Sequence, residues 1–398
     1  MIEENKRRYR LAILASHPIQ YQAPLFRALA AHPELDVTVF FCSDWGLKPY
    51  HDGGFGRQVK WDVPLTDGYA HEFLSNISLK PNPSNFAGLI NPGIIKRLKR
   101  GKFHAVMIHG WSRVTFLLAM SASTLFKIPV LMRGESNLLR NLSPRKAAIK
   151  RFLLSRLFKR TAGFLAIGRY NTEFYQYYGV QSERIFHVPY AIDNDYFSLR
   201  AAELLPQKAA LKKQLGIAAE LPAILFSGKL MDVKRPMDLL LAHETVVKTR
   251  KAALVYLGDG ELRASLEAYV KEKNLPDVHF VGFHNQTELP KFFAAADIFV
   301  LPSMSETWGL VINEALCFGL PVIVSDRVGA TGDLVRDSVN GFIYEAANPA
   351  VLAEKLETLL SDENLRRRMG EASKSLIANW SLQEDVQGIL SCLKQVVR

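Results

Sequence analysis

The sequence predicts an α/β protein made of two doubly wound, Rossmann-like parallel sheets that face each other across a cleft. Along the 398 residues, short apolar runs alternate with segments of helical periodicity. Uninterrupted apolar strands separated by helices are typical of a parallel sheet covered on both faces. The alternation breaks once, at residues 193–222. This segment contains two prolines, and we expect it to form one helix. A chain of this length also favours two domains.

The strands expected in the first half are short, and helical periodicity fills the intervals between them. His32-Pro33 ends the first helix, because proline lacks a backbone donor and restricts the residue before it. We expect strands at 11–16, 36–41, 105–109, 129–133, 163–168 and 184–188, and helices at 22–31, 114–126 and 171–178.

The alternation restarts after residue 222 and predicts a second sheet. We place the first domain at 1–193, the second at 194–380, and a final helix at 381–398 that the sequence permits to pack back on the first domain. Ligands of doubly wound sheets bind outside the carboxyl ends of the strands. We expect strands at 223–227, 253–258, 278–282, 297–302, 321–325 and 341–344, and helices at 237–249, 261–272 and 289–296.

Composition and cysteine usage favour a protein of the cytoplasm, and the basic clusters described below suggest a peripheral place at the inner face of the cell membrane. Cys42, Cys317 and Cys392 lie far apart and form no CxxC pair, which argues against a disulfide framework. The basic stretch near the N-terminus precedes only five apolar residues, at 11–15. A signal peptide needs roughly 7–15 of them. No apolar run approaches the ~20 residues of a membrane span.

The net charge of +11 is concentrated in the first half of the chain. Residues 1–200 hold 28 Lys and Arg against 14 Asp and Glu, a net of +14, whereas the remainder holds 22 against 25, a net of −3. A nucleic-acid binder is suggested only by the overall basicity. The acidic second half, and the absence of aromatic residues interleaved with basic ones, count against it. One basic domain indicates that this domain alone meets something anionic.

Two basic clusters, at 145–160 and 96–102, predict contact with an anionic membrane surface, because anionic lipid attracts such residues by about 1 kcal/mol each. Ser143-Pro144 predicts the N-cap and first residue of a helix. The alternative is an ordinary solvated helix with its apolar residues in the core. The helix has the basic residues Arg145, Lys146, Lys150, Arg151, Arg156, Lys159 and Arg160 and the apolar residues Ile149, Phe152, Leu153, Leu157 and Phe158, and the second cluster has Lys96, Arg97, Lys99, Arg100 and Lys102.

The first group of candidate binding residues is Gly228-Lys229 with Lys234, between an expected strand and a helix that Pro236 begins. A glycine at the strand end lets backbone approach a ligand closely. Two lysines five positions apart can neutralise a diphosphate, aided by the helix N-terminus. A solvated basic turn explains the same residues equally well.

The second group is Glu306 to Glu314, after the strand expected at 297–302. We expect a helix that begins near Gly309 and that Gly319 ends. Carboxylates at this separation could bind the hydroxyls of two sugar rings, and the helix-start amides between them suit phosphate oxygens. The spacing alone favours the plainer reading, in which Glu306 is a first-turn carboxylate and Glu314 faces solvent.

A third motif, Gly258-Asp259-Gly260-Glu261, follows the strand expected at 253–258. It lacks the third glycine of G-x-G-x-x-G and is better explained as a tight strand-to-helix turn. Asp193-Asn194-Asp195 matches the D-x-D pattern that binds a metal in other enzymes, but it lies at the expected connection between the domains. We therefore expect no metal site there.

These motifs, taken in order, resemble the family-4 glycosyltransferases of the GT-B fold. The resemblance rests on Gly228-Lys229 with Lys234, on Gly258-Asp259-Gly260, on Val281-Gly282-Phe283, on Glu306 with Glu314, and on Gly319-Leu320-Pro321. It covers nearly the whole second half, and the two glutamates eight positions apart are its most specific mark.

The resemblance implies a retaining glycosyltransferase that uses a nucleotide diphosphate sugar, with UDP the favoured nucleotide, and needs no metal or other cofactor. It makes the first domain acceptor-binding and the second donor-binding. Together with the basic clusters, it suggests a lipid-linked or surface-polysaccharide glycan of bacteria as acceptor. A nucleotide-sugar epimerase on the same fold is the alternative, since it would bind the same nucleotide.

Residue roles follow from the same resemblance. Lys229 and Lys234 would contact the diphosphate, Glu306 the donor sugar, and Glu314 the ribose. The remaining donor-binding residues would be Gly228, Phe283 near the base, and Trp308, Gly309, Leu310 and Val311 through their amides.

The first half departs from the family. Ser16-His17-Pro18-Ile19-Gln20 stands where many relatives have a glycine pair, and Glu135 stands about where many have a histidine facing the donor sugar. Glu135 is therefore a catalytic candidate in place of that histidine. The acceptor-side candidates are His17, Gln20, His109 and Arg133.

Overall fold

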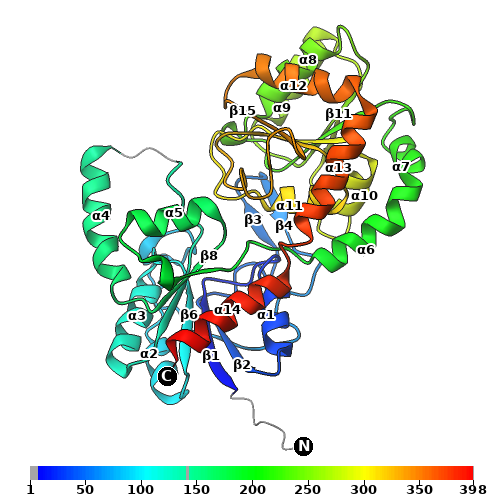
Figure 1. The fold of residues 1–398 in the computed structure, drawn as a ribbon. Helices are drawn as coiled ribbons and strands as arrows, with labels where there is room; N and C mark the ends of the chain where they lie inside the picture. Colours follow the sequence, from blue (N-terminus) through cyan, green and yellow to red (C-terminus); the bar gives the residue numbers. More distant parts are fainter. Residues whose placement is uncertain (1–7, 140–142, 398) are drawn as a thin grey trace, which may run out of the picture. The chain divides into compact units, whose positions relative to one another are not determined.

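The computed structural model describes residues 8–139 and 143–397, which form two compact units, each built on one parallel sheet (Figure 1). The α/β class and the two Rossmann-like sheets predicted from the sequence are confirmed. The first unit contains residues 8–50, 63–139, 143–190 and 382–397, and the second contains 51–62 and 191–381.

The first sheet has seven parallel strands in the order β5-β2-β1-β6-β7-β8-β9. Its strand order reverses between β1 and β6. The strands are β1 (Tyr9–Ala15), β2 (Leu35–Phe41), β5 (Ala70–Phe73), β6 (Ala105–His109), β7 (Val130–Arg133), β8 (Gly163–Ala166) and β9 (Ile185–His187). The α-helices between these strands are α1 (Ala23–Ala31), α2 (Gly93–Arg100), α3 (Val114–Phe126), α4 (Pro144–Phe158) and α5 (Arg169–Tyr177).

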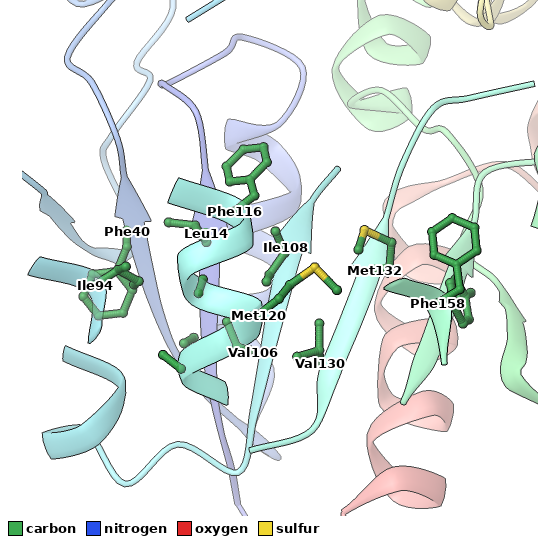
Figure 2. Close-up of a cluster of buried hydrophobic side chains, with 14 of the residues drawn as sticks. Leu14, Phe40, Ile94, Val106, Ile108, Phe116, Met120, Val130, Met132 and Phe158 are labelled. Carbon is green, nitrogen blue, oxygen red and sulfur yellow. The ribbon is translucent and has the colours of Figure 1, made fainter. Parts of the chain in front are cut away.

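Helices cover both faces of this sheet and bury an apolar core against each. On one face, Phe116 and Met120 of α3 lie against Leu14 of β1 and Ile108 of β6 (Figure 2). On the other face, α1 and the C-terminal helix α14 (Leu382–Val396) pack together over the strands. Because both faces are covered, the central strands β1, β6, β7 and β8 are buried almost throughout, whereas β2 and β5 on one side of the sheet include half-buried or exposed polar residues.

The second sheet has six parallel strands in the order β12-β11-β10-β13-β14-β15, and its order reverses between β10 and β13. The strands are β10 (Ala223–Ser227), β11 (Ala253–Leu257), β12 (Val278–Gly282), β13 (Ile298–Leu301), β14 (Val322–Ser325) and β15 (Gly341–Tyr344). The helices that follow β10 are α8 (Pro236–Val246), α9 (Arg263–Lys273), α10 (Leu289–Ala295), α11 (Leu310–Cys317), α12 (Pro349–Ser361) and α13 (Glu363–Ile377).

The connection between the sheets differs from its prediction. It contains two α-helices rather than one, α6 (Asn194–Leu204) and α7 (Lys208–Gln214), separated by a short 3₁₀ turn. Pro206 lies in that turn and cannot continue α6, because proline lacks the amide that the next helical turn needs. Asp193 accepts the amide of Tyr196 at 3.1 Å and so caps α6.

The short strands β3 (Tyr50–Asp52) and β4 (Arg57–Val59) form a separate two-stranded sheet. Residues 51–62, which we call the 51–62 hairpin, belong to the second unit, although the sequence prediction included them in the first domain. Hydropathy does not report this grouping, because the hairpin is held by polar and aromatic contacts to residues more than 170 positions away.

The C-terminal helix α14 returns to the first unit and contacts α1, β8 and β9 (Figure 1). Its Asp385 accepts a hydrogen bond from Arg133 Nη1 at 2.8 Å, and both side chains are at most 5% exposed. Burial raises the pKa of Asp385 to about 6, although the Arg133 cation opposes that rise. Arg133 also donates to the carbonyl of Pro189 at 3.2 Å, so one guanidinium ties α14 to the segment after β9.

None of the helices in the described parts of the chain is long and apolar enough to cross a bilayer.

We predict that Asp385→Ala lowers the free energy of unfolding by about 3 kcal/mol at pH 8, because it leaves a buried guanidinium without its counter-ion. Asp36→Ala is the control, since Asp36 forms a half-exposed ion pair with Arg10 at 3.1 Å. That substitution should cost less than about 1 kcal/mol. Urea unfolding measures both values. Equal losses of unfolding free energy for the two variants would contradict the claim that the buried Arg133–Asp385 pair anchors α14.

Candidate functional site

The candidate site begins at the point where the strand order of the second sheet reverses. Loops that follow β10 and β13 meet there, as they do at the ligand sites of doubly wound sheets. The first loop contains Gly228 and Lys229, and the second contains Glu306. The amide of Met304 donates to the carbonyl of Val233 at 2.8 Å, which joins the two loops directly.

Lys234 and Glu306, predicted to hold a diphosphate and a sugar, form an ion pair. Both are largely buried at the end of their loops. The amide of Glu306 donates to the carbonyl of Arg327 at 3.1 Å, and its carbonyl accepts from the amide of Gly329 at 3.0 Å. The backbone of Glu306 is thus fixed on both sides, while its carboxylate stays within reach of Lys234.

Lys229 has an acidic partner as well, Asp52 of the 51–62 hairpin. The ammonium lies 2.8 Å from Oδ1 and 3.0 Å from Oδ2 of that carboxylate. Each lysine predicted to neutralise a diphosphate is therefore paired with a carboxylate of the same unit.

The loop before α11 turns sharply at Gly309, whose φ of +97° is left-handed and favours glycine. The helix begins at Leu310 and its C-terminus is followed by Gly319, as predicted. The amides of Leu310 and Val311 belong to the first turn, where no intrahelical acceptor exists. Trp308, which is buried, donates from its indole to Asn313 at 3.0 Å and stacks on Trp380, so the loop is anchored beneath these amides.

Glu314 lies in the second turn of α11 and is only 8% exposed, so it does not face solvent. Burial raises the pKa of its carboxyl group to about 8. A buried carboxyl group is costly unless hydrogen-bond donors reach it. The vicinal hydroxyls of a ribose are donors of that kind, so the position suits the role that the resemblance implies.

The motif Gly258-Asp259-Gly260 forms the tight turn expected of it. A Cβ on Gly258 would lie 1.9 Å from the carbonyl oxygen of Gly228, so only glycine permits this approach. The carbonyl of Asp259 accepts the amide of Leu230 at 2.9 Å. The turn therefore shapes the loop that holds Lys229.

Phe283, predicted to lie near a base, follows β12 and is half-buried. Its ring makes an edge contact with Phe55 at 4.8 Å between centroids, and the Arg57 guanidinium lies 5.3 Å from its centroid. Both partners belong to the 51–62 hairpin.

In the first unit, two of the acceptor-side candidates lie at the corresponding reversal of strand order. His17 follows β1 and His109 ends β6. Burial and then Arg113 lower the pKa of His17 to about 4, while burial and then Arg133 lower that of His109 to about 3. Both imidazoles are therefore neutral at pH 7. Gln20 is half-buried in the turn before α1.

Among the described residues, His109 Nε2 is buried with no hydrogen-bond partner, and its Nδ1 lies 3.2 Å from Gln22 Nε2. Arg133 is committed to Asp385 and Pro189, contacts that hold the fold.

The carboxylate of Glu135 lies beside a pair of tyrosines. It accepts a hydrogen bond from the Tyr190 hydroxyl at 2.5 Å, and Tyr190 meets Tyr21 edge-on at 5.6 Å. Burial and then the Glu135 charge raise the pKa of Tyr190 above its ordinary value. Tyr190 thus stays protonated and continues to donate to Glu135.

The helix α4 begins at Pro144 with Ser143 as N-cap, as predicted. Of the apolar set predicted for this helix only Phe158 is fully buried, and the other buried residue of α4 is Leu154, which the prediction did not include. Ile149, Phe152 and Leu153 are 62%, 56% and 57% exposed, so most of the apolar set lies outside the core. In the other basic cluster, Arg97 pairs with Glu72 at 2.6 Å, an acid that the local sequence does not reveal.

Sequence reasoning missed four residues around the site: Asp52, Phe55, Arg57 and Trp380. Phe55 lies within the run Gly53-Gly54-Phe55-Gly56, and Arg57 follows it as the first residue of β4. This glycine-rich run was the one available signal of a turn. The pairing of Asp52 with Lys229 joins residues 177 positions apart and leaves no local trace.

Comparison with known proteins assigns residues 207–376 to the family described as glycosyl transferases, group 1. The chain is 30% identical over 228 residues to a D-inositol 3-phosphate glycosyltransferase of Xylanimonas cellulosilytica, a match that covers 56% of this chain and 54% of that protein. The chain thus spans about half the length of this curated relative.

Two solved structures share the fold over nearly the full chain. One is a glycosyltransferase from Rickettsia africae, with a TM-score of 0.74, 16% identity, and coverage of 98% of this chain and 99% of that one. The other is Anabaena HepE in complex with UDP, with a TM-score of 0.73, 17% identity, and coverage of 97% and 100%.

We predict that the buried Glu314 makes stability depend on pH. Its pKa is about 8 in the folded chain and 4.5 ordinarily, so its contribution is present below pH 4.5 and is lost as pH rises through 8. Between pH 6 and 8 the free energy of unfolding of the wild type should fall, relative to Glu314→Gln, by about 1 kcal/mol per pH unit. Glu345→Gln, at an exposed carboxylate, is the control. Parallel urea curves for wild type and Glu314→Gln at every pH would contradict the prediction.

Proposed function

Residues 207–376 form a group 1 glycosyl transferase domain, and on this basis we propose that the chain is a retaining, metal-independent glycosyltransferase that uses a nucleotide diphosphate sugar. One observation carries the proposal: Lys229, Lys234 and Glu306 gather at the reversal of strand order, with the buried Glu314 on the helix beyond. Two cations and two carboxylates at the carboxyl ends of strands suit a ligand with a diphosphate between two sugar rings.

In the proposed complex, the ammonium groups of Lys229 and Lys234 bind the diphosphate, and the first amides of α11 add donors to its oxygens. Glu314 accepts hydrogen bonds from the ribose, and Glu306 accepts them from the donor sugar. Gly228 lets backbone approach the phosphates, and Phe283 lies beside the base. Trp308 and Gly309 set the entry of α11, so that Leu310 and Val311 present their amides.

The proposed reaction is a front-face displacement. The bond between the anomeric carbon and the diphosphate oxygen breaks, and the acceptor oxygen bonds to that carbon from the same face. The departing phosphate oxygen takes the acceptor proton, so configuration is retained. The protein contributes by positioning the reactants and by stabilising the charge that develops on the diphosphate.

We propose that the first unit binds the acceptor. His17 and His109 are neutral and can exchange hydrogen bonds with a hydroxyl, and Gln20 lies in the turn beyond β1. Glu135 is oriented by Tyr190 and is proposed as a polar contact to the reacting sugar. Arg133 acts through the fold, because its donors are directed to Asp385 and Pro189.

We propose UDP as the nucleotide of the donor, since the resemblance favours it and the Anabaena neighbour, which shares this fold, was solved in complex with UDP. For the acceptor we propose a lipid-linked or surface-polysaccharide glycan of a bacterium. The exposed face of α4 supports this choice, because Phe152 and Leu153 lie among basic residues that include Arg151 and Arg156.

A helix that presents apolar and basic side chains together is suited to the surface of an anionic membrane. We therefore propose that α4 holds the enzyme peripherally at the inner face of the membrane, where such an acceptor would be found. The 96–102 cluster is proposed to add charge to this contact, with Arg97 already paired to Glu72.

We predict that Lys234→Ala lowers turnover about 10²-fold or more, because it removes a cation from the developing charge on the diphosphate. Turnover is measured as release of nucleoside diphosphate from the donor. Lys248→Ala, at an exposed lysine of the same unit, should retain the wild-type rate. Circular dichroism should show that both variants are folded. Near-normal turnover by a folded Lys234→Ala variant would refute the donor-site assignment.

We also predict that neutralising Arg145, Lys146, Lys150 and Arg151 to Gln removes most co-sedimentation with liposomes that contain anionic lipid. Loss of four charges near the surface corresponds to about 4 kcal/mol. A matched variant neutralises four exposed lysines of the second unit, Lys248, Lys251, Lys271 and Lys273, and should bind as the wild type does. Equal binding by wild type and both variants would remove α4 from the proposed membrane contact.

A further inference from the structure

The 51–62 hairpin packs on the rest of the second unit, although more than 120 residues separate the two in sequence. Asn285 donates from its side chain to the carbonyl of Lys60 at 2.5 Å, and the amide of Thr287 donates to Asp62 at 3.2 Å. These two bonds anchor the end of the hairpin beside Phe283.

The rest of the hairpin lies on the residues assigned to the donor. Phe55 contacts the ring of Phe283, and the Lys229 ammonium lies 4.9 Å from the centroid of Phe55. Gly54 is so close to Lys229 that a Cβ there would lie 2.5 Å from its Cδ. The hairpin thus contacts both the lysine expected to bind the diphosphate and the ring expected to lie near the base.

Asp52 is held in a turn that aims its carboxylate at Lys229. Its Oδ1 accepts the amides of Gly54 at 2.9 Å and Phe55 at 3.2 Å, and the same oxygen lies 2.8 Å from the lysine ammonium. Burial would raise the pKa of Asp52, but hydrogen bonds and charge from Lys229, with the two amides, bring it below its ordinary value. The group is therefore an anion at neutral pH.

Resting on the proposed function, we infer that Asp52 is a donor-site residue whose carboxylate competes with the donor's diphosphate for Lys229. Donor binding then releases Asp52 from the lysine, and the 51–62 hairpin responds to occupancy of the site.

The competition for Lys229 is electrostatic. Two of the three ammonium donors of Lys229 already reach the two oxygens of Asp52. A diphosphate on the same ammonium would lie beside a carboxylate of like charge, and such neighbours repel strongly in a partly buried site. We therefore expect the diphosphate to displace Asp52 from the ammonium, while the bonds from Asn285 and Thr287 still hold the end of the hairpin.

Asp52→Asn tests this inference without disturbing the turn, because the amide oxygen of asparagine can still accept from Gly54 and Phe55. Calorimetry on the full chain would measure binding of UDP, GDP, ADP and inorganic pyrophosphate. We expect Asp52→Asn to bind the diphosphates about two- to fivefold more tightly than the wild type. Asp67→Asn removes the same charge from the first unit and should leave the dissociation constants unchanged.

A double-mutant cycle makes the test specific to Lys229. In a Lys229→Gln background, Asp52→Asn should produce no further change in affinity. Equal or weaker binding by Asp52→Asn, or a gain that persists without Lys229, would overturn the inference while the donor site stands. Failure of the wild type and Asp52→Asn alike to bind any diphosphate would overturn the proposed function and, with it, this inference.

Discussion

The candidate site depends on how two loops of the second sheet are joined. The bond from the Met304 amide to the Val233 carbonyl, 2.8 Å long, links the loop after β10 to the loop after β13. That link brings Lys234 to Glu306 across 72 positions of sequence. Since parallel strands end at the same edge of a sheet, the reversal of strand order opens this edge to a ligand. The remaining site residues are placed relative to these two loops.

Charge balance is the second constraint on this site. A lysine that lay partly buried without an anion would be costly, and here each of the two has one, Asp52 or Glu306. Glu314 is the exception, since burial alone governs its carboxyl group and raises its pKa. In the proposed complex, a nucleotide sugar would offer a diphosphate to the lysines in place of their carboxylate partners, and hydroxyl donors to the carboxylates. The site is thus built around polar groups whose partners a donor can replace.

Much of the fold could be predicted because its signals are local. Apolar runs such as 105–109, 223–227 and 341–344 match β6, β10 and β15 in full. The two glutamates and two lysines stood out because their spacing resembles a family pattern. What could not be predicted depends on distant contacts. The 51–62 hairpin joins the second unit through Lys229 and Phe283, and Arg133 is committed to Asp385 across 252 positions. The exposure of Ile149 and Phe152 likewise depends on which side of α4 meets the core.

We propose that the second unit binds a nucleotide diphosphate sugar at the residues that follow β10 and β13. A thermal-shift screen of the purified full chain across nucleoside diphosphates and their sugars tests it most directly. A ligand that binds the folded chain raises the melting temperature by mass action. We expect a selective rise with one nucleotide diphosphate and its sugar, with UDP first among those tested, and a smaller rise with the matching monophosphate. A melting temperature that no nucleotide diphosphate or sugar changes would contradict it.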